Sequence, residues 1–99
     1  MLTSSEILSF LAENKSHFQD HYHVIKLGLF GSYARDLANE QSDIDILIEL
    51  APGTQNIYEL KKELKIFIKN KFNKEVDICR EKAIKPVFRD LIFQEAVYV

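Results

Sequence analysis

Three aspartates are the residues in this chain whose type and spacing are best suited to chemistry. Asp43 and Asp45 stand two apart at the start of an apolar stretch, and Asp77 stands between Val76 and Ile78. Side chains two apart on a strand point to the same face, so Asp43 and Asp45 project together, with Cα atoms about 6.5 to 7 Å apart. Converging carboxylates attract a divalent cation, and Mg²⁺ completes its coordination with water and substrate phosphates. Asp77, on another predicted strand, can add a third carboxylate.

These carboxylates allow two interpretations. In a two-metal site, with ions about 3.5 to 4 Å apart, one ion activates an attacking oxygen and the other steadies the leaving phosphates. A D-x-D pattern also occurs at the solvated start of an ordinary strand. We expect Asp77 to be buried between its apolar neighbours, where a charge is unfavourable unless a metal or a basic side chain balances it. The three residues alone leave both interpretations open.

A glycine–serine pair can bind phosphate. Gly31-Ser32 follows an apolar, strand-forming segment and precedes a short helix-forming one. Backbone N–H groups at a helix start favour an anion, Gly31 lets the backbone approach it closely, and the Ser32 hydroxyl can donate to a phosphate oxygen. Arg35, one helical turn further, can reach a triphosphate or pair with Asp36. An isolated pair of this kind is otherwise a turn with a serine N-cap.

The elements that must position these residues follow from hydrophobic periodicity. The pattern predicts an α/β (α+β) domain with a small mixed sheet of about three strands flanked by helices, and one domain spans residues 1–99. The first helix begins with the capping-box pattern Thr3-x-x-Glu6. The predicted helices cover about 4–18, 33–38, 56–72 and 86 onward, and the predicted strands cover 24–30, 42–50 and 75–79.

Composition limits the class of partner. The chain has 99 residues, is 46% hydrophobic and carries a formal charge of −2. That charge gives no general attraction to nucleic acid or to an anionic membrane, so we expect direct binding to neither. One cysteine, Cys79, cannot form an internal disulfide, and no apolar run reaches the ~20 residues of a membrane span. We therefore expect a cytoplasmic protein.

Gly31-Ser32, ten intervening residues and Asp43-Ile44-Asp45 together resemble the G-S-x10-D-x-D signature of minimal nucleotidyltransferases in the DNA polymerase β-like superfamily. The resemblance covers essentially the whole chain, with Asp77 in the place of the third carboxylate. Chains this small resemble the antitoxin partners of HEPN-domain toxins.

The resemblance implies that Gly31, Ser32 and Arg35 bind the triphosphate of ATP. It implies that Asp43, Asp45 and Asp77 are catalytic and ligate Mg²⁺, with two ions expected. The family activity is transfer of AMP from ATP to a tyrosine of the HEPN toxin, which implies a hetero-oligomer. The alternative is a non-catalytic antitoxin that neutralises its partner by contact. Asp36 stands where the family commonly has glycine.

Other features have simpler explanations. His17, His21 and His23 are interpreted as a hydrated helix end rather than a zinc site, and Cys79 as a small core residue. Lys61, Lys65 and Lys69 form a stripe that is solvated or meets an anionic partner. The segment 86–99 carries more apolar residues than one helix face needs, which indicates partner docking, cover within the monomer, or a homodimer: Phe88, Leu91, Ile92, Phe93, Val97, Tyr98 and Val99.

Overall fold

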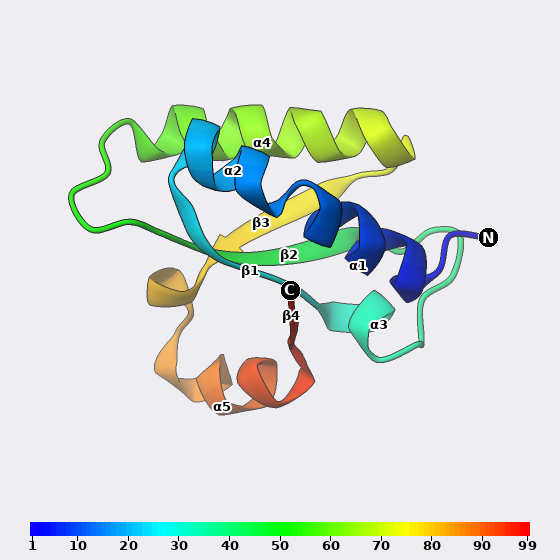
Figure 1. Cartoon of the computed structure of the whole chain (residues 1–99). Coiled ribbons are helices and arrows are strands. Elements are labelled where there is room, and N and C mark those ends of the chain that lie inside the picture. The colour runs from blue at the N-terminus through cyan, green and yellow to red at the C-terminus, as the bar shows by residue number, and fades with distance from the viewer.

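A mixed four-stranded sheet in the order β3-β2-β1-β4 forms the centre of the computed structural model, which describes all residues from Met1 to Val99 (Figure 1). Strands β1 (Val24–Phe30) and β2 (Ile44–Leu50) are antiparallel, whereas β2 and β3 (Val76–Arg80) are parallel. The short β4 (Val97–Tyr98) pairs antiparallel with β1. The predicted fold class is confirmed, and the sheet has one strand more than expected.

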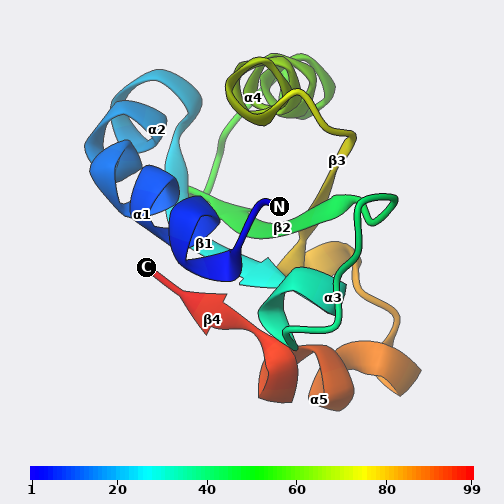
Figure 2. The same cartoon turned by 90° about the vertical axis from the view of Figure 1, so that its right-hand side faces the viewer.

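Helices cover the two faces of the sheet unequally. Helices α1 (Ser4–Glu13), α2 (Lys15–Tyr22) and α4 (Ile57–Phe72) lie on one side (Figure 2). The short α3 (Gly31–Ala34), the 3₁₀ helix η1 (Glu81–Ala83) and α5 (Pro86–Glu95) lie toward the other. None of these helices combines the length and apolar composition needed to cross a membrane.

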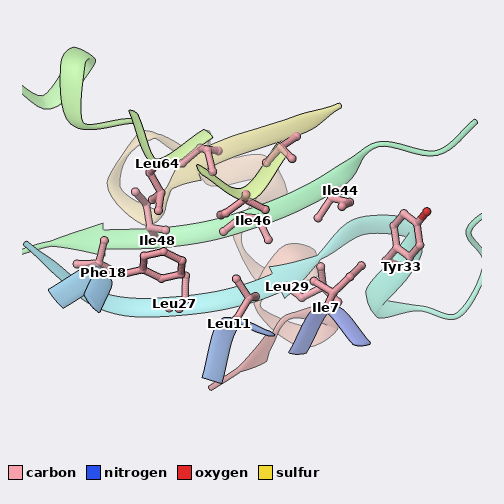
Figure 3. Close-up of a cluster of buried hydrophobic side chains, with 14 of the residues drawn as sticks. Ile7, Leu11, Phe18, Leu27, Leu29, Tyr33, Ile44, Ile46, Ile48 and Leu64 are labelled. Atoms are coloured by element: carbon pink, nitrogen blue, oxygen red, sulfur yellow. The ribbon is translucent and has the colours of Figure 1, made fainter. Parts of the chain in front are cut away.

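The core lies between the sheet and the three helices α1, α2 and α4. Ile44, Ile46 and Ile48 of β2 are fully buried there, as the alternation of the strand predicts (Figure 3). They pack among Leu27 and Leu29 of β1 and the apolar faces of the helices. Burial of apolar surface of this kind is the main stabilising contribution in so small a domain.

The first helix is interrupted, contrary to the prediction of one helix over about 4–18. Thr3 caps α1 as expected, since its hydroxyl accepts the N–H of Glu6 at 3.2 Å. Asn14 then leaves helical geometry at φ −102° and ψ 8°, and its side-chain amide donates to the carbonyl of Phe10 at 2.9 Å. Asparagine competes for backbone hydrogen bonds in this way, so the chain ends α1 and begins α2 at this residue.

The C-terminal segment also differs from its prediction as one helix. Helix α5 ends at Glu95, and the chain then returns along β1, with Gly28 opposite Tyr98. A Cβ atom at Gly28 would lie 3.0 Å from the carbonyl oxygen of Val97. Glycine therefore permits this close approach of β4, and its place inside a strand is the sequence signal for it.

Candidate functional site

Asp45 lies at the centre of the candidate site. It is the second residue of β2 and is in register with Asp77 on β3. Register partners on neighbouring strands are about 4.8 Å apart and point to the same face, so the two carboxylates lie on one face of the sheet, opposite the helical core. Asp43 immediately precedes β2 and is exposed. The strand therefore begins at Ile44, inside the D-x-D motif, rather than at residue 42 as predicted.

The electrostatic environment confirms that these carboxylates affect one another. Burial, followed by the negative charges of Asp77 and Asp43, raises the pKa of Asp45 from 3.8 to about 6, against a smaller lowering by Arg35. A carboxyl group whose pKa is raised by neighbouring carboxylates favours the binding of a proton or a cation, because either one reduces the repulsion between the negative charges. The three carboxylates therefore make this part of the sheet locally negative.

Asp77 corrects one expectation. Its side chain is exposed, although Val76 and Ile78 on either side are buried, because β3 is an edge strand and alternate residues face opposite sides of the sheet. The expectation that Asp77 is buried, with a metal or a basic side chain balancing its charge, is therefore wrong. The exposure leaves Asp77 accessible to an incoming substrate.

Gly31 fits tightly against Asp45. A Cβ atom built on Gly31 would lie 2.1 Å from Oδ2 of Asp45, and the backbone has φ +74°. Both observations require glycine at this position, first because a side chain would overlap the carboxylate and second because the left-handed conformation disfavours other residues. The glycine–serine turn and the D-x-D strand are thus in direct contact.

The turn after Gly31 is shorter than the predicted helix over 33–38. Helix α3 ends at Ala34, and Asp36 adopts a left-handed conformation with φ 58°. Aspartate tolerates that conformation better than most residues, so the chain keeps the turn with Asp36. The Asp36 carboxylate accepts a hydrogen bond from the Ser4 hydroxyl at 3.1 Å.

Ser32 and Arg35 lie beside this turn. Ser32 is not the N-cap of α3, because Phe30 occupies that position. Arg35 donates to the carbonyl of Gly31 at 3.4 Å and approaches Glu95 of α5 at 3.8 Å. It does not pair with Asp36, which was the alternative considered from the sequence.

Sequence reasoning missed a buried ion pair on the same side of the sheet. Glu49 of β2 is 5% exposed, and two nitrogens of Arg80 donate to it at 2.8 and 3.0 Å. The N–H groups of Leu50 and Lys82 donate to the same carboxylate. Burial alone raises the pKa of Glu49, but these hydrogen bonds outweigh it and lower the pKa overall. The one available signal was a charged residue between Ile48 and Leu50 in an otherwise apolar stretch of strand.

Two hollows differ in their relation to the carboxylates. The larger, of about 380 Å³, lies between α1 and the end of α4, away from the three aspartates. A second hollow, of about 290 Å³, is bordered by Asp77 and by side chains of α4. Position relative to the carboxylates makes the second one relevant to the site, although it is smaller.

His21 and His23 are exposed, as expected for a hydrated helix end, whereas His17 is partly buried and Cys79 lies outside the buried core cluster. The rings of His17 and His21 lie 4.4 Å apart, and His17 packs on Phe67. Cys79 is partly buried, and burial raises the pKa of its thiol. No group of three or more His, Cys, Asp and Glu side chains forms a ready-made metal site anywhere in the chain.

Similarity to known proteins identifies the family of this chain. A family model described as a nucleotidyltransferase domain matches residues 6–99. The protein adenylyltransferase MntA of Thermococcus cleftensis is 34% identical over 101 residues, covering 100% of this chain and 98% of that protein. The chain therefore belongs to the nucleotidyltransferase domain family.

Solved structures share the fold. A structure described as a minimal nucleotidyltransferase has a TM-score of 0.80 at 24% identity, covering 97% of this chain and 95% of the other. The complex of the tri-AMPylated Shewanella oneidensis HEPN toxin with its MNT antitoxin contains a chain with a TM-score of 0.57 at 21% identity. That match covers 96% of this chain and 66% of the matched one.

Proposed function

We propose that this chain is a Mg²⁺-dependent protein adenylyltransferase that transfers AMP from ATP to a tyrosine hydroxyl of a HEPN-type toxin and acts as its antitoxin. The observation that carries the proposal is the contact between Gly31 and Asp45, with Asp45 in register with Asp77. The turn to which we assign phosphate binding and the carboxylate pair therefore lie side by side. The name of the MntA relative and the HEPN–MNT complex support the choice of donor and partner.

The residues fit Mg²⁺ by the chemistry of their donors. Hard carboxylate oxygens suit this ion, and it usually binds through one or two carboxylates together with substrate phosphates, so a ready-made group of three ligands is not required. Asp43 and Asp45 would hold the ion, and Asp77 would complete the site. When bound, Mg²⁺ neutralises phosphate charge and lowers the pKa of a coordinated hydroxyl.

The chain itself binds and orients the two substrates. Ser32 donates to a phosphate oxygen, and Arg35 supplies positive charge on the same side. Asp77 accepts a hydrogen bond from the acceptor hydroxyl and turns its oxygen toward the α-phosphorus. That oxygen forms the new bond to phosphorus as the bond to the bridging oxygen of the β-phosphate breaks, and pyrophosphate leaves with the electron pair. The hydroxyl proton leaves toward Asp77 or water.

The mass of the partner tests this proposal. The chain is co-expressed with a HEPN-type toxin, and the intact mass of the toxin is measured. We expect additions of about 329 Da, one for each AMP. With Asp43→Asn in place of the wild type, the toxin should keep its unmodified mass. A toxin that is neutralised at unchanged mass by the wild-type chain would establish the alternative, a non-catalytic binding module.

Helix α5 is the surface we assign to the partner. None of its residues is buried, and Val87, Phe88 and Leu91 are 78%, 52% and 56% exposed. Exposed apolar side chains gathered on one helix are typical of protein interfaces. Glu95 near Arg35 connects this helix to the phosphate side of the site. A partner docked on α5 would thus stand close to the carboxylates, where proximity favours transfer.

Substitution on α5 separates docking from catalysis. We expect Val87→Asp with Leu91→Asp to abolish co-purification with the toxin and to stop its modification. Ile66→Asp, at a comparably exposed apolar position of α4, should change neither. Tyr98, which the sequence also suggested for docking, is a less suitable position for this test. It belongs to β4 and its hydroxyl donates to Glu81, so its substitution would also disturb the fold. An intact complex with both α5 substitutions would exclude this surface.

A further inference from the structure

A basic hollow of about 290 Å³ adjoins the carboxylate site at the outer edge of the sheet. It lies between the first turns of α4 and strand β3, and Asp77 belongs to both the hollow and the carboxylate site. Strand β3 has no neighbour on its outer side. The hollow is lined by Tyr58, Lys61, Lys62, Lys65, Asp77 and Ile78.

The position of this hollow relates it to the acceptor rather than to the triphosphate. Gly31 follows β1, Asp45 lies on β2 and Asp77 on β3, so the hollow is on the far side of Asp77 from the phosphate-binding turn. In an in-line displacement, the attacking oxygen enters opposite the leaving pyrophosphate. With the triphosphate at Gly31, the acceptor enters from the β3 side. This step rests on the proposed function.

The lysines of the hollow have no partner within the chain. The four salt bridges of the structure involve other basic residues, and Lys61, Lys62 and Lys65 donate no hydrogen bond. Glu75, whose pKa is lowered mainly by Lys69 and slightly by Lys65, is already bound by Lys69 at 2.7 Å. The chain as a whole has a formal charge of −2, so this positive surface is a local feature.

We propose that the hollow binds acidic residues that flank the acceptor hydroxyl of the protein substrate. Lys61 and Lys65 are one helical turn apart, about 6 Å along α4. Carboxylates two residues apart in an extended peptide are separated by about 6.5 to 7 Å, which matches that spacing. The unpaired edge of β3 accommodates an extended segment, and Tyr58, 76% exposed, offers an aromatic contact beside it.

Short tyrosine peptides test the proposal directly. The wild-type chain with Mg²⁺ and ATP is given Glu-Glu-Tyr-Glu-Glu, Gln-Gln-Tyr-Gln-Gln and Lys-Lys-Tyr-Lys-Lys, and kcat/KM for AMP transfer is measured by mass spectrometry. We expect the acidic peptide to be preferred over the neutral one by about tenfold, mainly through KM. The double variant Lys61→Glu, Lys65→Glu should reverse the order and prefer the basic peptide.

A matched control separates local charge from net charge. Lys15→Glu with Lys71→Glu makes the same change in net charge away from the hollow and should retain the preference for the acidic peptide. A wild type that transfers AMP to all three peptides equally would overturn the inference while leaving the proposed function intact. A reversal produced equally by the control variant would also overturn it.

A binding measurement does not depend on transfer. In an NMR titration with Glu-Glu-Tyr-Glu-Glu, we expect the backbone amide chemical shifts of Lys61, Lys62 and Lys65 to change. In the same titration with the neutral peptide Gln-Gln-Tyr-Gln-Gln, we expect these chemical shifts to stay the same. If the wild type transfers AMP to no acceptor but these chemical shifts change, the proposed function fails and the assignment of the hollow stands. Parallel titrations with AMP and with RNA serve as comparisons. Changes confined to other residues, or changes at these lysines with AMP or RNA but not with the acidic peptide, would overturn the assignment of the hollow.

Discussion

Asp45 combines partial burial with two like charges, and that combination makes its substitution informative. Burial first, and then Asp77 and Asp43, raise its pKa to about 6, above the ordinary value of 3.8. The folded chain therefore binds more protons than the unfolded chain between about pH 4 and pH 6, and stability contributed by this group falls as pH rises through that window. Above pH 6 the ionised Asp45 disfavours the ligand-free fold.

The first prediction is that Asp45→Asn stabilises the ligand-free domain at pH 7 while abolishing AMP transfer. A pKa shift of this size corresponds to about 3 kcal/mol, which we reduce to about 1 kcal/mol because the carboxyl is half exposed and water screens it. Urea unfolding at pH 4 and pH 7 measures the effect, which should vanish at pH 4. Asp90→Asn on α5 is the exposed control. A variant destabilised at pH 7 would contradict this account of Asp45.

The second prediction uses two glycines with the same backbone conformation and different surroundings. Gly31 and Gly53 have φ of +74° and +81°, but only Gly31 has atoms, those of Asp45, in the space of a Cβ. Gly53→Ala should cost about 1 kcal/mol from backbone conformation alone. Gly31→Ala should cost at least about 1 kcal/mol more and eliminate transfer, because the Asp45 carboxylate must move. If both variants lose the same stability in thermal unfolding, the contact between Gly31 and Asp45 does not add to the cost of the substitution.

At the scale of elements, the face of the sheet opposite the core is organised by a charged pair as well as by helices. Glu49 of β2 accepts from Arg80 at the end of β3 and from the N–H of Lys82 in η1. This carboxylate therefore holds together two strands and the turn that leads toward α5. The strands that carry Asp45 and Asp77 are also joined by these contacts, since Glu49 lies four residues beyond Asp45 on β2 and Arg80 three residues beyond Asp77 on β3.

The third prediction is that Glu49→Gln destabilises the domain by about 2 kcal/mol at pH 7, since it leaves Arg80 partly buried without its charge partner. The pKa of Glu49 is lowered in the folded state, so this contribution is present above the unfolded pKa and is lost as pH falls through the folded pKa. Denaturant unfolding at pH 7 and pH 3 measures both effects. Glu75→Gln, which removes an exposed pair with Lys69, should have little effect at either pH.

At the scale of the whole molecule, the proposed triphosphate site is assembled from segments far apart in the sequence. The turn after β1, the start of β2 and the edge strand β3 meet only when the domain is folded. A ligand that binds this assembly stabilises the folded state and not the unfolded chain. We therefore expect ligand binding and folding to be coupled in this protein.

The fourth prediction is that ATP with Mg²⁺ raises the melting temperature. Ligand at 100 times its Kd adds about 2.7 kcal/mol, which shifts Tm by about 11 to 22 °C in a domain of this size at 4 to 8 °C per kcal/mol. Differential scanning calorimetry with and without Mg²⁺ measures the shift. Asp43→Asn should remove the Mg²⁺-dependent part. An unchanged Tm for the wild type at millimolar ATP and Mg²⁺ would contradict the assignment of the site.

Local patterns predicted the elements that position the site. The apolar run 24–30, the alternation in 44–50 and the helical periodicity of 57–72 correspond to β1, β2 and α4. These predictions succeeded because each element buries one face or stripe, and burial of that kind leaves a regular pattern of apolar residues. The family likewise followed from the spacing of Gly31-Ser32 and Asp43-Ile44-Asp45, and the match to the family model confirms it.

Only the tertiary structure decided the features that depend on contacts between distant segments. The exposure of Asp77 follows from the place of β3 at the sheet edge, and the pairing of Glu49 with Arg80 depends on how β3 and the turn after it pack beside β2. The return of β4 along β1 and the contact of Gly31 with Asp45 are likewise set by packing. The physical reason is that periodicity records which face of an element is buried, whereas the neighbour on that face is chosen by the fold as a whole.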